Sequence, residues 1–104
     1  MILMIDNKKV KKIISERKKL HPDDPAVEKK WSELTDIFKK NEKETIKYLE
    51  NCEGEELEWI SEIFEDISEK LQSKKFIDTL ELLEKKYPEL DLKMDVEFAK
   101  KAIN

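Results

Sequence analysis

The apolar residues of this chain recur every three or four positions, which is the spacing of one face of an α-helix. The pattern is strongest from about Glu55 to Leu71, where one helical face carries Leu57, Ile60, Ile63, Phe64, Ile67 and Leu71. One Gly and three Pro are too few for the turns of a many-stranded sandwich or barrel. With 104 residues, the chain has the length of one domain. We therefore expect a single all-α domain over residues 1–104, either a compact bundle or a short stack of about six antiparallel helices.

Capping residues and prolines predict where the helices begin and end. The first expected helix runs from about Asp6 or Asn7 to Leu20, and the second starts at Asp24-Pro25 and carries Val27, Trp31, Leu34 and Phe38. The third starts at Asn41, and the fourth runs from about Glu55 to Leu71. The fifth is capped by Ser73 and ended by Pro88, and the last runs from about Met94 or Asp95 to Ile103. Gly54 ends the third helix and is expected in the left-handed conformation. Leu90 and Leu92 are expected to cover the core as extended chain.

Charge is unevenly distributed along the chain. Residues 1–47 contain 13 Lys+Arg and 9 Asp+Glu, residues 48–70 contain 1 and 9, and residues 71–104 contain 7 and 7. The three net charges are therefore +4, −8 and 0, which add up to the overall −4. The modest overall value conceals one strongly acidic segment around the expected fourth helix.

On that helix the glutamates follow one another at intervals of three or four residues, in a row opposite the apolar face. Each like-charge neighbour pair costs an isolated helix roughly 0.2 to 0.5 kcal/mol. A solvated, helix-forming face would explain the row, but its cost favours docking of a basic partner. Trp59 lies beside the row and is expected to be a half-exposed anchor, although contact with a neighbouring helix would also explain it. The candidate partner-binding residues are Glu55, Glu58, Trp59, Glu62, Glu65, Asp66 and Glu69.

The residue combinations that most catalytic and metal sites need are missing from the sequence. The single His21 and single Cys52 are far apart, and neither a zinc site, a di-iron motif nor a calcium loop can be built from them and the carboxylates. Acidic neighbours should raise the pKa of Cys52, which is expected to be a small buried residue or a helix-end residue and not a reactive thiol. We expect no metal, no cofactor and no enzymatic activity.

The sequence favours a location in the cytoplasm. No segment approaches the roughly 20 apolar residues of a membrane helix, so no membrane partner is expected. The start, Met1 to Asp6, is too short for the apolar region of a signal peptide. A lone cysteine cannot form an internal disulfide.

The run from Cys52 to Ile67, continuing from Lys86 to Asp91, resembles small bacterial immunity proteins that are encoded beside polymorphic or contact-dependent toxins. The resemblance covers the second half of the chain and includes no catalytic motif. It implies an antidote that binds one cognate toxin domain, such as a nuclease, and blocks its active site or a nearby surface.

Three hypotheses follow. The first is a non-enzymatic inhibitor of a toxin with a basic surface, steered by the acidic row. The second is a helical adaptor or regulatory subunit that binds its partner through an apolar groove, with little sensitivity to salt. The third is a small nucleic-acid-binding regulator that uses the lysines of the first helix. It is less favoured, because no exposed aromatic residues are interleaved with those lysines and a solvated face explains them equally well.

Overall fold

The computed structural model describes residues 5–104; residues 1–4, which belong to the start considered above as a signal peptide, lie outside the described residues. Residues 5–104 contain only helices, which confirms the all-α fold class. The elements are α1 (Asn7–Lys18), α2 (Ala26–Phe38), α3 (Glu42–Asn51), α4 (Gly54–Ile60), the 3-10 turn η1 (Ser61–Ile63), α5 (Phe64–Leu71), α6 (Lys74–Lys86), the 3-10 turn η2 (Pro88–Leu90) and α7 (Lys93–Lys101).

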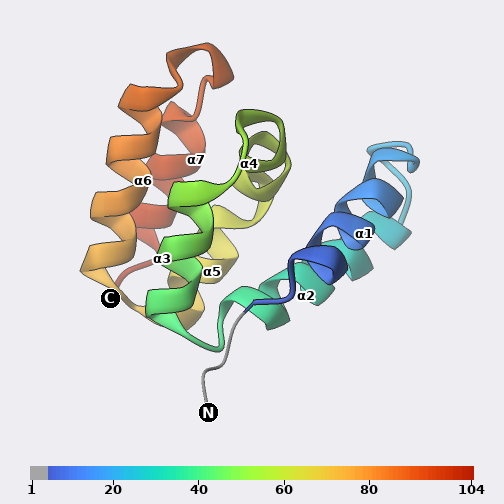
Figure 1. The fold of residues 1–104 in the computed structure, drawn as a ribbon, viewed down its shortest axis with the longest axis horizontal. Helices are drawn as coiled ribbons and strands as arrows, with labels where there is room; N and C mark the ends of the chain where they lie inside the picture. The colour runs from blue at the N-terminus through green and yellow to red at the C-terminus, as the bar shows by residue number, and fades with distance from the viewer. Residues whose placement is uncertain (1–4) are drawn as a thin grey trace.

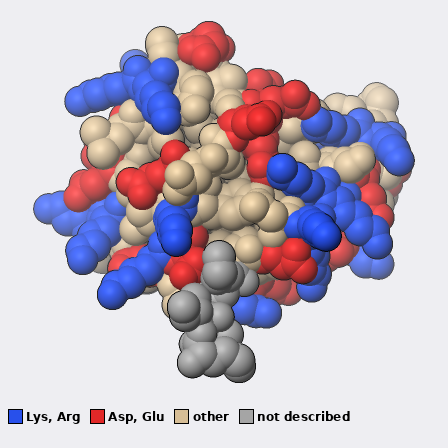
Figure 2. All heavy atoms as spheres, viewed as in Figure 1, with Lys and Arg blue, Asp and Glu red and all other residues tan. Residues whose placement is uncertain are grey.

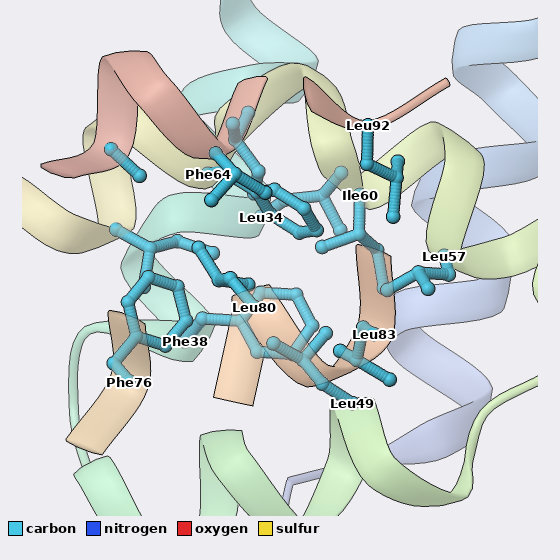
Figure 3. Close-up of a cluster of buried hydrophobic side chains, with 14 of the residues drawn as sticks. Leu34, Phe38, Leu49, Leu57, Ile60, Phe64, Phe76, Leu80, Leu83 and Leu92 are labelled. Atoms are coloured by element: carbon cyan, nitrogen blue, oxygen red, sulfur yellow. The ribbon is translucent and has the colours of Figure 1, made fainter. Parts of the chain in front are cut away.

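The helices form a hairpin and a bundle that share one core. In Figure 1, α1 and α2 form a hairpin on one side of the molecule, and α3, α5, α6 and α7 stand together on the other. Buried side chains of both parts, such as Ile14 of α1, Leu34 of α2 and Leu80 of α6, belong to one hydrophobic cluster. Figure 3 shows the centre of this cluster, where Leu34 and Phe38 of α2 meet the bundle side chains. The hairpin is therefore anchored in the same core as the rest of the described chain.

Side-chain caps occupy the predicted starts of three helices. Asp6 accepts hydrogen bonds from the amides of Lys8 and Lys9. Asn41 accepts from the Glu44 amide at 2.9 Å, and Ser73 accepts from the Phe76 amide at 3.0 Å. Each cap satisfies an amide that has no partner within its own helix.

Gly54 does not have the left-handed conformation that the sequence predicted. It is the first residue of α4, and no glycine among the described residues has a positive φ. A Cβ at this position would lie 3.3 Å from Cε1 of Tyr87, so the glycine allows a close approach of the Tyr87 ring. The left-handed residues are Gln72 (φ 47°) and Asp91 (φ 52°).

The segment between α6 and α7 also differs from its prediction. Leu90 and Leu92 were expected in extended chain, but Pro88–Leu90 form the turn η2 and Leu92 has helical angles, φ −82° and ψ −2°. Leu92 is 1% exposed, so it does cover the core. A proline at the start of a 3-10 turn supplies a preset φ and needs no amide donor.

The predicted continuous helix from Glu55 to Leu71 is wrong, because the chain breaks at η1 between α4 and α5. Ile63 leaves the helical region, with φ −118° and ψ 13°. The Ser61 hydroxyl donates to the Glu58 carbonyl at 2.5 Å, a local bond of the kind that bends helices. The break changes the direction of the acidic row, which a straight helix would have kept on one side.

Candidate protein-binding surface

The structure divides the six predicted acidic binding residues into two groups. Two glutamates of the row, Glu55 and Glu62, form ion pairs with α1. The other four acidic residues, Glu58, Glu65, Asp66 and Glu69, are exposed and take part in none of the ion pairs found among residues 5–104. The second group is therefore exposed and without an ion pair among the described residues, whereas the first group is paired with α1.

Glu62 lies between the hairpin and the bundle, where Arg17 and Trp31 bind it. The Arg17 guanidinium donates twice to this carboxylate, from Nε to Oε1 at 2.9 Å and from the terminal nitrogen to Oε2 at 2.7 Å. The Trp31 indole donates to Oε1 at 3.0 Å. The Arg17 side chain is 8% exposed and the Glu62 side chain 27%. This geometry makes Glu62 a structural residue, because its oxygens are already occupied by donors from α1 and α2.

Trp59 is partly exposed, as the sequence predicted, and its ring lies against two cations of α1. The Arg17 guanidinium carbon lies 5.1 Å from the centre of the Trp59 ring, and Lys18 Nζ lies 5.9 Å from it. Cations at these distances are attracted to the face of the ring. The ring therefore contributes to the contact between α1 and α4, as the alternative explanation of this residue requires.

Lys18 extends this contact to Glu55, with which it forms an ion pair. The hydrogen bond from Lys18 lowers the pKa of the Glu55 carboxyl, and the Lys18 charge lowers it further. Figure 2 shows the basic side chains over α1 next to acidic side chains over α4. The basic helix α1 is thus an intramolecular partner for part of the acidic row.

The sequence carried two signals of this pairing that the first interpretation missed. Arg17 occupies a position of the apolar stripe of the first helix, between Ile14 and Leu20. A charged residue in a buried register needs an opposite charge nearby. The other signal is the charge imbalance itself, since the basic first segment of +4 is an obvious partner for the acidic segment of −8.

The exposed acidic group gathers on α5. Glu65 and Glu69 are one turn apart, and Asp66 lies between them in sequence. Partial burial raises the pKa of Asp66, and the nearby charge of Glu69 raises it further, although Lys70 opposes the shift. Burial and the charge of Glu69 thus both disfavour the charged form of Asp66.

A pair of exposed apolar side chains lies on α7, beside α5. Met94 is 61% exposed and Phe98, one turn later, is 43% exposed. Sequence periodicity assigned Phe98 to the apolar face of the last helix, and it did not identify this pair as a surface feature. A third exposed apolar residue, Leu82 on α6, is 64% exposed and stands apart from the pair in sequence.

The hollows of the described surface include one that Cys52 borders. One of about 190 Å³ is lined by residues that include Tyr48 and Cys52. Burial raises the pKa of the Cys52 thiol to about 12, and the charge of Glu56 raises it further. This hollow and another of about 310 Å³ both border Ile5, next to the residues outside the description. A thiol with so high a pKa is not a nucleophile near neutral pH.

Searches for metal-binding groups and membrane helices give negative results for the described part of the chain. Residues 5–104 hold no group of three or more His, Cys, Asp or Glu side chains placed to bind a metal ion. None of their helices combines the length and the apolar character that crossing a membrane requires.

Comparison with protein-family models, curated proteins and solved structures finds no match to this chain.

Proposed function

We propose that this chain is a non-enzymatic binding protein that recognises a partner with a basic surface through the exposed acidic residues Glu58, Glu65, Asp66 and Glu69. The observation that carries the proposal is that, among residues 5–104, none of these four carboxylates takes part in an ion pair, while Glu55 and Glu62 of the same row are paired. Folding has paired Glu55 and Glu62 with α1 and has left like charges exposed on α4 and α5. Neighbouring carboxylates on a helix repel one another, and a basic partner would relieve this repulsion.

We further propose that the partner is a bacterial toxin domain, which this chain neutralises as an immunity protein. Support comes from the resemblance of residues 52–67 and 86–91 and from the charge of the exposed surface. Many enzymes that act on nucleic acids need a basic groove for phosphates, and a row of carboxylates can occupy such a groove. Complementary charges of this kind raise association rates and select the partner.

The charge part of the proposal is tested by reversing Glu58, Glu65 and Glu69 to Lys. Glu62 is left unchanged, because its reversal would disrupt the Arg17 pair and the fold. The matched control reverses three exposed glutamates elsewhere, Glu28, Glu50 and Glu89, and changes the net charge equally.

At low salt we expect the test variant to associate with the partner at least about tenfold more slowly than the control, with a weaker dependence of its rate on salt. Equal rates for the two variants would contradict the proposal. Wild-type binding that is insensitive to salt would favour the helical adaptor, which recognises its partner through apolar contacts.

The identity of the partner requires a functional assay after capture. The wild-type chain and the test variant are used to capture proteins from the native cells, and each protein retained only by the wild type is expressed alone in a host. We expect one of them to stop growth, and co-expression of the wild-type chain, but not of the variant, to restore it. A captured partner that is harmless to the host would contradict the immunity function.

A further inference from the structure

Helices α5 and α7 run parallel and in close contact, although α6 separates them in sequence. The Ser68 hydroxyl of α5 donates to the Ala99 carbonyl of α7 at 2.6 Å. At the end of α5, the Gln72 amide donates to the Ala102 carbonyl at 2.8 Å. Residue numbers therefore rise together along the contact, from 68 to 72 on α5 and from 99 to 102 on α7, so the two helices are parallel. Two small residues at the contact, Ser68 and Ala99, are both 0% exposed and let the backbones approach closely.

Helical geometry places two rows of side chains beside this contact, on its solvent side. A residue three or four positions from a contact residue lies about 40° to 60° from it around the helix. On α5, Glu65 precedes Ser68 by three positions and Glu69 lies one turn after Glu65. On α7, Phe98 precedes Ala102 by four positions and Met94 lies one turn before Phe98. All four of these side chains are exposed.

We propose that Met94 and Phe98 are the apolar centre of the docking surface and that Glu65 and Glu69 form its charged edge, so that the occupant is a basic amphipathic helix of the partner. This inference rests on the proposed function and adds the shape of the partner's contact. Because α5 and α7 are parallel, an apolar row and an acidic row lie side by side. A helix with apolar residues one turn apart and lysines or arginines on the adjoining face matches both rows.

Charge complementarity selects this occupant over a second copy of the chain. A symmetric pair that met through this face would bring the carboxylates of Glu65 and Glu69 close to their own copies. The Phe98 ring already has a cation near it, since Lys101 Nζ lies 5.9 Å from its centre. The attraction for a basic occupant therefore comes from the carboxylates of Glu65 and Glu69, and Phe98 contributes apolar area.

The experiment titrates the ¹⁵N-labelled full-length chain with a synthetic Leu/Lys peptide of about five helical turns whose leucines occupy one face. A Leu/Glu peptide of the same pattern is the charge control. The test variant is Met94→Ala/Phe98→Ala, and the matched control is Leu82→Ala on α6. Circular dichroism and urea denaturation establish that each variant is folded.

We expect the Leu/Lys peptide to shift the amide signals of α5 and α7 and the Leu/Glu peptide to leave them unchanged. The test variant should bind at least about tenfold more weakly, as happens when a desolvated anchor is removed. The Leu82→Ala variant should bind as the wild type does.

Absence of binding, signal shifts centred on other elements, or an unaffected test variant would overturn the inference. A dimer in sedimentation that Phe98→Ala dissociates would also overturn it, because the face would then be a self-interface. If reversal of Glu58, Glu65 and Glu69 slows association with the captured partner but the test variant does not weaken it, this inference fails and the proposed function stands. If the reversal has no effect, the proposed function itself fails.

Discussion

At the scale of single residues, Arg17 and Glu62 determine how the acidic segment is used. The Arg17 side chain is nearly buried. The Glu62 carboxylate accepts two hydrogen bonds from Arg17 and one from Trp31, and these bonds join the hairpin to the bundle. Such a pair contributes little net stability compared with apolar packing, but removing one partner leaves the other as an uncompensated charge. Glu62 therefore belongs to the folding of the chain, whereas Glu65 and Glu69 are available for contact.

We predict that Glu62→Ala lowers the free energy of unfolding by about 2 to 3 kcal/mol, somewhat less than the loss of a fully buried partner, because the Glu62 side chain is 27% exposed. Arg17 would keep its charge without an acceptor, and the Trp31 indole would lose its partner. Urea denaturation measures the change. Glu69→Ala is the control and should stay within about 0.5 kcal/mol of the wild type. An equal effect of the two substitutions would show that the pair does not stabilise the fold.

At the scale of elements, the sequence predicted what depends on near neighbours. The caps at Asn41 and Ser73 and the apolar stripes are local features, because each depends on residues within a few positions. The place of Glu62 depends on Arg17, which lies 45 residues away in the chain. No periodicity within residues 55–71 reveals a partner that folding brings from another helix.

The sequence predicted those parts of the candidate surface that depend on near neighbours, and it did not predict the parts that depend on contacts between helices. The acidic residues of α5 were found because composition and helical spacing identify them. The Met94–Phe98 pair was not recognised, because its exposure depends on the parallel packing of α5 and α7. The position of Trp59 follows from the same kind of long-range contact, since Arg17 and Lys18 lie at its ring.

The start of α7 provides a pH-dependent prediction. Burial raises the pKa of Asp95, and the nearby charges of Glu62 and Asp91 raise it further, while a hydrogen bond with Ser61 opposes the shift. A raised carboxyl pKa in the folded state means that folding favours the protonated side chain. The stability that this protonated side chain contributes is present below the unfolded-state pKa and is lost as pH rises through the folded-state pKa.

Asp95→Asn should therefore increase the free energy of unfolding at pH 7 relative to the wild type. The gain should disappear below the ordinary Asp pKa of about 3.9, where the wild-type side chain is protonated in both states. Urea denaturation at neutral and acidic pH tests this, with the exposed Asp78→Asn as the control. A variant that is less stable at pH 7 would mean that the hydrogen bond with Ser61 outweighs burial.

At the scale of the whole molecule, the hairpin and the bundle are joined by one hydrophobic cluster. Val10 and Ile14 of α1 belong to the same cluster as Phe76 of α6 and Val96 of α7. The described chain has a radius of gyration of 12.9 Å, close to the roughly 13 Å of a compact domain of about 100 residues. Parts that share a core usually unfold together.

We predict that urea unfolding is a single transition. Far-UV circular dichroism reports all helices, whereas the fluorescence of Trp31 and Trp59 reports the junction between the hairpin and the bundle. The two signals should give the same midpoint within error. A fluorescence transition that precedes the loss of helix would show that the hairpin separates first.

The position of the two tryptophans has a consequence for detecting ligands. Both indoles lie beside Arg17, and the α5–α7 face contains neither of them. A ligand that binds to that face without disturbing α1 would leave the intrinsic tryptophan emission of the protein unchanged. A change in emission upon complex formation would therefore show that binding at the α5–α7 face has altered the contacts of α1 with the two tryptophans.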